Sequence, residues 1–145
     1  MRVLADSCVW SAVLRRGSGV NAPIRREMQG LIESGAVEII GPIRQEVLSG
    51  VRSDTQLDSL QEAMGLFPEI RIPSEDYDTA AKFYNLCRRR GIQGSGTDFL
   101  ICAVTAREDI PIFTIDQDFE SYAEILPVAL HRSSARSWSQ VHRTP

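Results

Sequence analysis

The sequence predicts a single α/β domain whose central, mostly parallel sheet carries helices on both faces. Short apolar runs alternate along the chain with longer segments in which apolar residues recur at helical spacing. A length of 145 residues suits one domain, and 43% hydrophobic with 24% charged residues is an ordinary globular composition. We expect this domain to span residues 1–132, followed by a loose polar tail over residues 133–145.

The first half of the chain predicts two strands and three helices. In order they are a buried strand over residues 2–5, helices over 7–15 and 21–35, a strand over 37–40 and a short helix over 42–50. The second helix has Pro23 near its first turn, where proline is tolerated. Its apolar residues are spaced to share one face: Ile24, Met28, Leu31 and Ile32.

The second half predicts three long helices and shorter elements between them. They are a helix over residues 54–66, a brief strand over 70–72, helices over 74–90 and 98–107, a strand over 112–115, a helical turn over 117–122 and an edge strand over 128–130. Ser74 is the expected N-cap of the helix that ends before Gly91. The helix over 98–107 is apolar almost all round, which predicts that it is buried. The helix over 54–66 carries one apolar stripe: Leu57, Leu60, Met64 and Phe67.

Cysteine usage and hydropathy indicate a cytoplasmic protein. The three cysteines, Cys8, Cys87 and Cys102, form no C-x-x-C pair, and their odd number suits a reducing compartment. No run approaches the ~18 apolar residues of a membrane span, and the N-terminus has no signal-peptide layout. We therefore expect no contact with a membrane.

The scarcity of histidine and lysine argues against several classes of enzyme. His131 and His142 lie in the last fifteen residues, which disfavours a hydrolase triad or a histidine zinc site. Lys82 is the only lysine and follows no glycine-rich loop, so a phosphate-binding P-loop is excluded. The net charge of −3 gives no overall attraction to nucleic acid, which leaves local arginine clusters.

Four acidic residues stand at positions typical of a metal site. Asp6 and Asp116 each follow a predicted strand, and the carboxyl ends of parallel strands share the edge where ligands bind. Asp98 opens the buried helix, and Glu46 is spaced to share a helix face with apolar residues. Taken singly, each aspartate also suits a helix cap and Glu46 a solvated position. Together, oxygen ligands without nitrogen or sulfur select Mg²⁺ or Mn²⁺.

Four segments in this order resemble the PIN-domain nucleases, and among them the toxin subunits of VapBC-type toxin–antitoxin pairs, over nearly the whole chain. The segments are LADSCVW at residues 4–10, QEVLSG at 45–50, DFLICA at 98–103 and TIDQDF at 114–119. The resemblance implies a single PIN-like domain that acts as a metal-dependent endoribonuclease and toxin. It also implies an RNA substrate, a cognate antitoxin protein and a homodimer.

The same resemblance assigns roles to individual residues. Asp6, Glu46, Asp98 and Asp116 match the catalytic acids, of which Asp6, Asp98 and Asp116 would bind the metal and Glu46 would act through a water or a second ion. Ser7 and Thr114 match supporting hydroxyls. Asp118 matches a further acid, with a cap on the adjacent turn as the alternative. Cys8 stands where serine or asparagine is usual, and we favour a packed core residue there over a supporting hydrogen bond.

Water activated by the bound metal would attack the phosphodiester bond, with no covalent protein intermediate. The candidate RNA contacts are Arg15, Arg16, Arg88, Arg89 and Arg90, and the competing interpretation is that they complement helix dipoles. The apolar stripes fit a core or an antitoxin groove. Three alternatives remain at this point: a non-catalytic PIN-like module that binds RNA or protein, a receiver-type phosphoacceptor domain and a metal-dependent phosphatase of small molecules.

Overall fold

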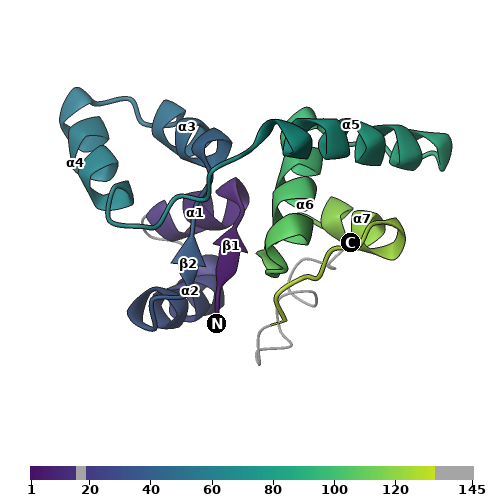
Figure 1. The fold of residues 1–145 in the computed structure, drawn as a ribbon. Helices are drawn as coiled ribbons and strands as arrows, with labels where there is room; N and C mark the ends of the chain where they lie inside the picture. The colour runs from purple at the N-terminus through teal and green to yellow at the C-terminus, as the bar shows by residue number, and fades with distance from the viewer. Residues whose placement is uncertain (16–18, 133–145) are drawn as a thin grey trace.

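A three-stranded parallel sheet forms the centre of the molecule. The computed structural model describes residues 1–15 and 19–132, so the expected tail over 133–145 and Arg16 lie outside the described residues. The strands are β1 (Val3–Ala5), β2 (Val37–Glu38) and β3 (Ile112–Phe113), in the order β2-β1-β3. Leu4 pairs with Glu38 on one side and with Ile112 on the other, both in parallel register. β1 and β2 lie side by side in Figure 1, and the pairing of all three strands confirms the predicted parallel sheet.

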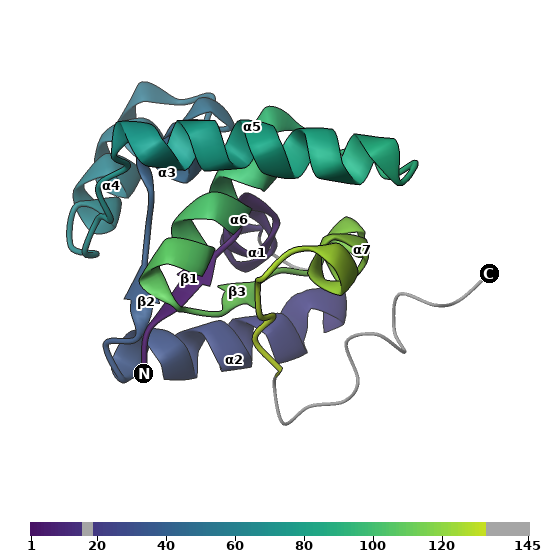
Figure 2. The same ribbon diagram turned by 45° about the vertical axis from the view of Figure 1, so that its right-hand side comes forward.

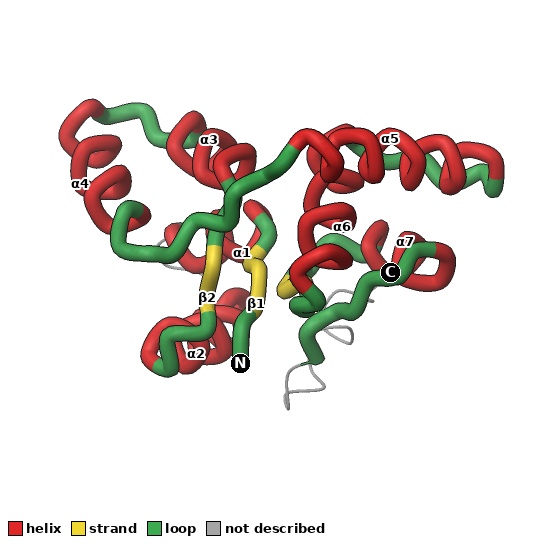
Figure 3. Tube along the Cα trace, in the orientation of Figure 1, coloured by secondary structure: helices red, strands yellow, loops and turns green. Residues whose placement is uncertain are grey.

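The strands are shorter than the sequence predicts, as the yellow segments of Figure 3 show. The strands expected at 70–72 and 128–130 are reduced to single parallel bridges, Ile39 to Glu69 and Ile112 to Leu130. Pro68 and Pro73 flank the first of these segments, and a proline has no N–H with which to extend a ladder. β3 ends at Phe113 because the chain then turns, with the N–H of Asp116 bonded to Thr114 Oγ1.

Helices surround the sheet and place it in the interior. Within the described residues they are α1 (Ser7–Leu14), α2 (Ala22–Glu33), α3 (Gly41–Ser49), α4 (Asp54–Met64), α5 (Ser74–Arg89), α6 (Gly96–Glu108) and α7 (Asp118–Ile125), with a 3₁₀ turn over Gly19–Asn21. In Figure 2 the layers run from α5 through α6 and the three strands to α2. Both sides of the sheet are therefore covered, as predicted.

Several helix ends differ from the expected ones, among them ends of α5, α6 and α7. Pro73, whose ψ of 162° is extended, occupies the N-cap position of α5 without a side-chain capping bond. Ser74 is already the first helical residue, so the prediction of a Ser74 N-cap is wrong. α6 begins at Gly96, two residues early, because the Ser95 side chain accepts a hydrogen bond from the N–H of Asp98. α7 continues to Ile125, beyond the single turn expected.

Burial confirms the prediction for α6 and corrects it for α4. Every residue of α6 from 99 to 105 is buried, as its apolar surface requires. In α4 only Met64 is buried, while Leu57 and Leu60 are half-buried, because the helix lies at the periphery (Figure 1). In α2 the apolar residues predicted to share one face are buried, except for Ile32, which is exposed. Among the described residues no helix is long and apolar enough to cross a membrane.

Candidate active site

Asp6 is the most enclosed of the predicted acids. It lies between the end of β1 and the start of α1, and only 5% of its surface is exposed. Its Oδ1 accepts a hydrogen bond from the N–H of Ser7 at 2.7 Å, which caps α1. Its Oδ2 accepts from Thr114 Oγ1 at 3.0 Å and from Cys8 Sγ at 3.3 Å. Asp6 therefore caps a helix and also belongs to a polar cluster that joins β1 to the end of β3.

Burial raises the pKa of the Asp6 carboxyl above its usual value of 3.8. Hydrogen bonds from Cys8, Thr114 and Ser7 oppose this rise in pKa, and the negative charge of Asp98 adds to it. Among the described residues, no arginine, lysine or histidine forms an ion pair with Asp6. The carboxylate is buried with hydrogen-bond donors but without a counter-charge.

Thr114 and Cys8 connect Asp6 to the opposite strand end. Thr114 Oγ1 donates to Asp6 and accepts from the N–H of Asp116 at 3.0 Å, so one hydroxyl links two of the predicted acids. Cys8 Sγ lies 3.4 Å from the same hydroxyl oxygen. Burial, with the charge of Asp6, raises the pKa of Cys8 to about 12, so the thiol keeps its proton and acts as a donor. The expectation that Cys8 is merely a packed core residue is therefore incomplete.

Asp116 lies on the turn between β3 and α7, Asp118 is the first residue of α7, and both are exposed. Asp116 Oδ1 accepts a hydrogen bond from the N–H of Asp118 at 3.0 Å. Asp116 therefore performs the capping that the sequence suggested for Asp118, and it does so with one oxygen only. The Asp118 side chain receives no hydrogen bond within the described residues.

Asp98 projects from the first turn of α6 toward α7. Its Oδ2 accepts a hydrogen bond of 2.8 Å from the hydroxyl of Tyr122, a fully buried residue that sequence analysis missed. Burial, the bond to Asp98 and the charges of Asp98, Asp118 and Asp116 all raise the pKa of Tyr122. Of these carboxylates, Asp98 is the one in hydrogen-bond contact with the hydroxyl. The only sequence signal for Tyr122 is a tyrosine one helical turn after Asp118, which predicts a core residue equally well.

Glu46 stands apart from this cluster. It lies on α3, and its side chain is exposed, so the expectation that Glu46 shares the apolar face of its helix is wrong. The apolar contacts of that helix are made by its neighbours Ile43 and Val47. Within the described residues, no hydrogen bond or ion pair joins Glu46 to the other acids. Its part in the site remains a prediction.

The donor set of Asp6, Asp98 and Asp116 fits a hard divalent cation. All three offer carboxylate oxygens, and Oδ1 of Asp98 and Oδ2 of Asp116 receive no hydrogen bond from the described residues. In the described part of the chain, no three acidic, histidine or cysteine side chains are grouped closely enough to enclose a metal. Mg²⁺ keeps several waters and binds through one or two carboxylates, so a closed cage is not required.

The arginines predicted to contact RNA are exposed where the structure describes them. Arg15 follows α1 directly, and Arg88, Arg89 and Arg90 end α5. The guanidinium of Arg88 lies 5.6 Å from the centre of the Tyr84 ring. Arg88 and Arg89 occupy the last turn of α5, where they also complement the negative end of the helix. Neither role excludes the other.

Fold and site together define an α/β domain with carboxylates placed where two parallel strands end and three helices begin. The chain belongs to the PIN domain family, whose model matches residues 3–125. It is 29% identical to Ribonuclease VapC11 of Mycobacterium tuberculosis over 126 residues, which cover 85% of this chain and 92% of that protein.

Two solved structures share the fold. VapC20 of M. tuberculosis, described as a toxin that cleaves the sarcin-ricin loop, has a TM-score of 0.66 at 18% identity and covers 87% of this chain and 98% of its own. A toxin–antitoxin complex from Klebsiella pneumoniae has a TM-score of 0.63 at 16% identity and covers 88% of this chain and 95% of that one. At these identities the likeness concerns the fold.

Proposed function

We propose that this protein is a VapC-type ribonuclease, the toxin of a type II toxin–antitoxin pair, which hydrolyses RNA phosphodiester bonds with the help of Mg²⁺ or Mn²⁺. The observation that carries the proposal is that the cluster of Asp6, Asp98 and Asp116, near the ends of β1 and β3 and the start of α6, forms no ion pair among the described residues. The PIN domain of this chain, and its 29% sequence identity with VapC11 over most of both chains, support the ribonuclease assignment.

Each residue of the cluster has a separable task in this proposal. Asp6, Asp98 and Asp116 would hold the cation, and Glu46 would act through a water or a second ion. The cation would stabilise charge on the phosphate and make a water molecule more acidic. Ser7 and Thr114 fix the two oxygens of Asp6, and Thr114 also ties the Asp116 backbone to it.

The substrate and the protein partner belong to the same proposal. Arg15 and Arg88–Arg90 are exposed cations that would contact the RNA backbone, joined by Arg16 outside the described residues. An antitoxin segment would dock on apolar side chains of α2 and α4, such as the exposed Ile32 and the half-buried Leu60. Co-purification with the product of a neighbouring gene tests the antitoxin, and light scattering tests the homodimer.

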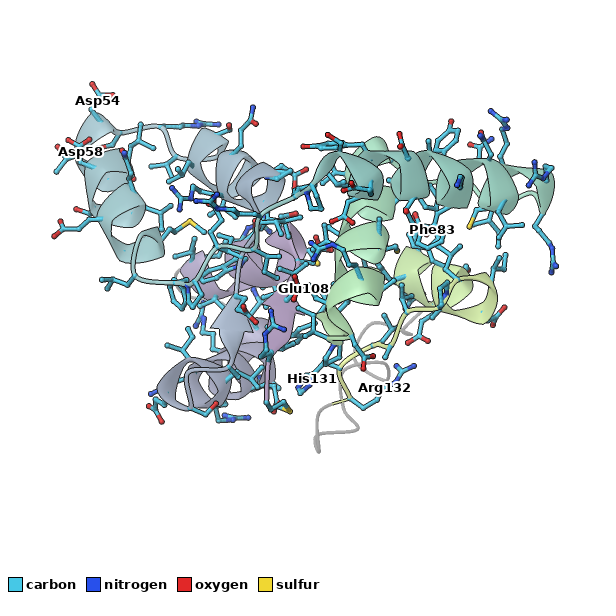
Figure 4. The ribbon with its side chains drawn as sticks, in the orientation of Figure 1. Asp54, Asp58, Phe83, Glu108, His131 and Arg132 are labelled. Carbon is cyan, nitrogen blue, oxygen red and sulfur yellow. The ribbon has the colours of Figure 1, made fainter. Side chains whose placement is uncertain are left out.

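RNA cleavage by purified protein tests the catalytic part. Cleavage is expected with Mg²⁺ or Mn²⁺, and it should stop when a chelator is added and resume when metal is restored. Asp98→Asn should lower the rate at least ~100-fold, because an electrostatic contact to the reacting centre is lost. Asp58→Asn is the matched control, since Figure 4 places Asp58 on α4, away from α6 and α7.

One observation favours a second candidate, a non-catalytic PIN-like module that binds RNA or protein. In the part of the chain that the structure describes, no ready-made group of three metal ligands exists. The module would bind RNA without cutting it. Full activity in chelator, or equal rates for wild type and Asp98→Asn, would contradict the metal-dependent nuclease; RNA binding without cleavage at any metal concentration would support the module.

A further inference from the structure

The contact between Tyr122 and Asp98 joins two helices at the edge of the proposed site. The Tyr122 hydroxyl donates to Asp98 Oδ2 at 2.8 Å, and its second acceptor, the carbonyl oxygen of Gln93, lies at 3.5 Å. The first distance is that of a strong hydrogen bond to a carboxylate, and the second is marginal. The hydroxyl therefore donates its hydrogen bond to Asp98.

Aromatic packing holds the ring of Tyr122 in place. Tyr122 is fully buried, and its ring packs against Phe99 with centroids 4.9 Å apart and against Phe119 with centroids 5.1 Å apart. Phe99 is the residue after Asp98 in α6, and Phe119 lies in the first turn of α7. The same aromatic packing thus fixes both the donor and the helix that carries the acceptor.

Gly94 makes room for this hydroxyl. A Cβ atom at Gly94 would overlap the Tyr122 hydroxyl oxygen and lie 2.8 Å from the ring carbon that bears it. Gly94 has an ordinary backbone conformation, because the positive φ angles of described glycines occur at Gly35 and Gly91. What position 94 requires is therefore the absence of a side chain.

We propose that Tyr122 is a positioning residue for Asp98, and that Gly94 supports this role by leaving space for the Tyr122 hydroxyl. The proposal rests on the proposed function, in which Asp98 binds a divalent cation. Tyr122 occupies Oδ2 and leaves Oδ1 without a partner among the described residues, so the carboxylate presents one fixed oxygen to the cation. Partners of this kind orient metal ligands, and removing one weakens metal affinity or activity about 10- to 100-fold.

The test compares Tyr122→Phe with Tyr84→Phe. Both substitutions remove one hydroxyl, and both rings pack on Phe99, with Tyr84 at 5.5 Å, but the hydroxyl of the exposed Tyr84 makes no hydrogen bond within the described residues. Calorimetric titration with Mn²⁺ alone should show affinity ~10- to 100-fold lower for Tyr122→Phe. Affinity should be unchanged for Tyr84→Phe. Circular dichroism confirms that both variants are folded.

A second variant separates positioning from simple core packing. Gly94→Ala displaces the hydroxyl while keeping the tyrosine, so it should weaken Mn²⁺ binding as Tyr122→Phe does. The double variant, with both Gly94→Ala and Tyr122→Phe, should bind Mn²⁺ no more weakly than the weaker-binding single variant, because both changes remove the same contact. In RNA cleavage, Tyr122→Phe should lower kcat at saturating RNA and leave KM unchanged.

The outcomes distinguish this proposal from the proposed function. If wild type binds Mn²⁺ but does not cut RNA, the proposed function fails, and the calorimetric comparison still decides the role of Tyr122. If Tyr122→Phe is folded and binds Mn²⁺ as wild type does, or if wild type binds no Mn²⁺, the positioning proposal is overturned.

Discussion

Two groups of acidic side chains border the same sheet, and their surroundings differ in one respect. The acidic site, made of Asp6, Asp98 and Asp116, has hydrogen-bond donors but no cationic side chain among its described contacts. The ion-paired network lies around the start of β1 and the end of α6. It consists of Arg2, Glu38, Asp76, Arg107 and Glu108.

Arginine contacts in the network are short. Arg2 bonds to Glu38 at 2.5 Å and to Glu108 at 3.0 Å, and Arg107 bonds to Asp76 at 2.9 Å and to Glu108 at 2.6 Å. The hydrogen bonds from Arg2 and then Arg107 lower the pKa of Glu108, whereas burial raises the pKa of Asp6. Carboxylates with arginine partners thus hold strands and helices together. Those without such partners have capacity left for a cation from solution.

A pocket of about 590 Å³ accompanies the network, and none of the predicted catalytic acids lines it. Its charged walls include Arg2, Glu38, Arg107 and Glu108, which already satisfy one another. This pocket therefore does not mark the acidic site. The unpaired charge on the acidic residues is a better guide to that site.

Breaking the network should give the largest loss of stability. In the Arg107→Leu variant, Asp76 would remain buried, with 2% of its surface exposed. It would lose both hydrogen bonds from the Arg107 Nε. An uncompensated buried charge costs about 3 kcal/mol, the lower end of the usual range, because Arg107 itself is about a third exposed. Denaturant unfolding measures this loss.

Asp76→Asn in the Arg107→Leu background should recover part of that stability, since it removes the stranded charge. RNA cleavage per folded molecule should stay at the wild-type level in both variants. An Arg107→Leu protein as stable as wild type would contradict the structural role assigned to the network.

Metal should stabilise the acidic site by a comparable or smaller amount. A cation that binds only the folded state adds about 2.7 kcal/mol at a hundredfold excess over Kd. This corresponds to a Tm increase of roughly 5 to 10 °C for a domain of this length. Calorimetric scans with and without Mn²⁺ measure it.

Asp116→Asn separates the two tasks of Asp116. Asparagine still accepts the hydrogen bond from the N–H of Asp118, so stability without metal should be equal or higher. The Mn²⁺-induced rise in Tm should mostly disappear. An undiminished rise in this variant would remove Asp116 from the metal site and leave it as a cap alone.

The two regions should respond to pH with opposite sign. The pKa of Glu108 is lowered in the fold, so its contribution is present above its ordinary value of 4.5 and is lost as pH falls below it. The pKa of Asp6 is raised, so its burial costs stability above its ordinary value of 3.8, and protonation removes that cost.

Unfolding free energies of wild type, Glu108→Gln and Asp6→Asn across pH 3 to 7 test this contrast. The advantage of wild type over Glu108→Gln should shrink below about pH 4.5. Relative to wild type, Asp6→Asn should gain stability as pH rises from 3. Parallel curves for all three proteins would contradict the electrostatic difference between the regions.

The smallest effect is expected at Cys8. Cys8→Ser replaces a weak donor to Asp6 with a stronger one and keeps the contact with Thr114, so stability should change by less than about 1 kcal/mol. RNA cleavage should be retained or slightly raised. A Cys8→Ser protein without activity would mean that the thiol has a chemical role beyond hydrogen bonding.

Local patterns in the sequence determined the elements and two of their consequences. Apolar residues all round residues 98–107 predicted the buried helix α6, because a helix without a polar face has no side for water. Asp6 and Asp116 were predicted to meet because both follow strands of one parallel sheet, and Thr114 does link them. Even local signals failed where two residues competed for one role, as at Pro73 and Ser74.

Tertiary structure alone decided which acids are paired and which are free. Arg107 and Asp76 are 31 residues apart, and Tyr122 and Asp98 are 24 apart. No period of hydrophobicity encodes such contacts, because they depend on how α5 and α7 pack against α6. Exposure of Glu46 follows in the same way from the packing of α3, whose Ile43 and Val47 point inward. The sequence specifies the chemistry of each side chain, but packing between distant elements decides which counter-charge each carboxylate meets.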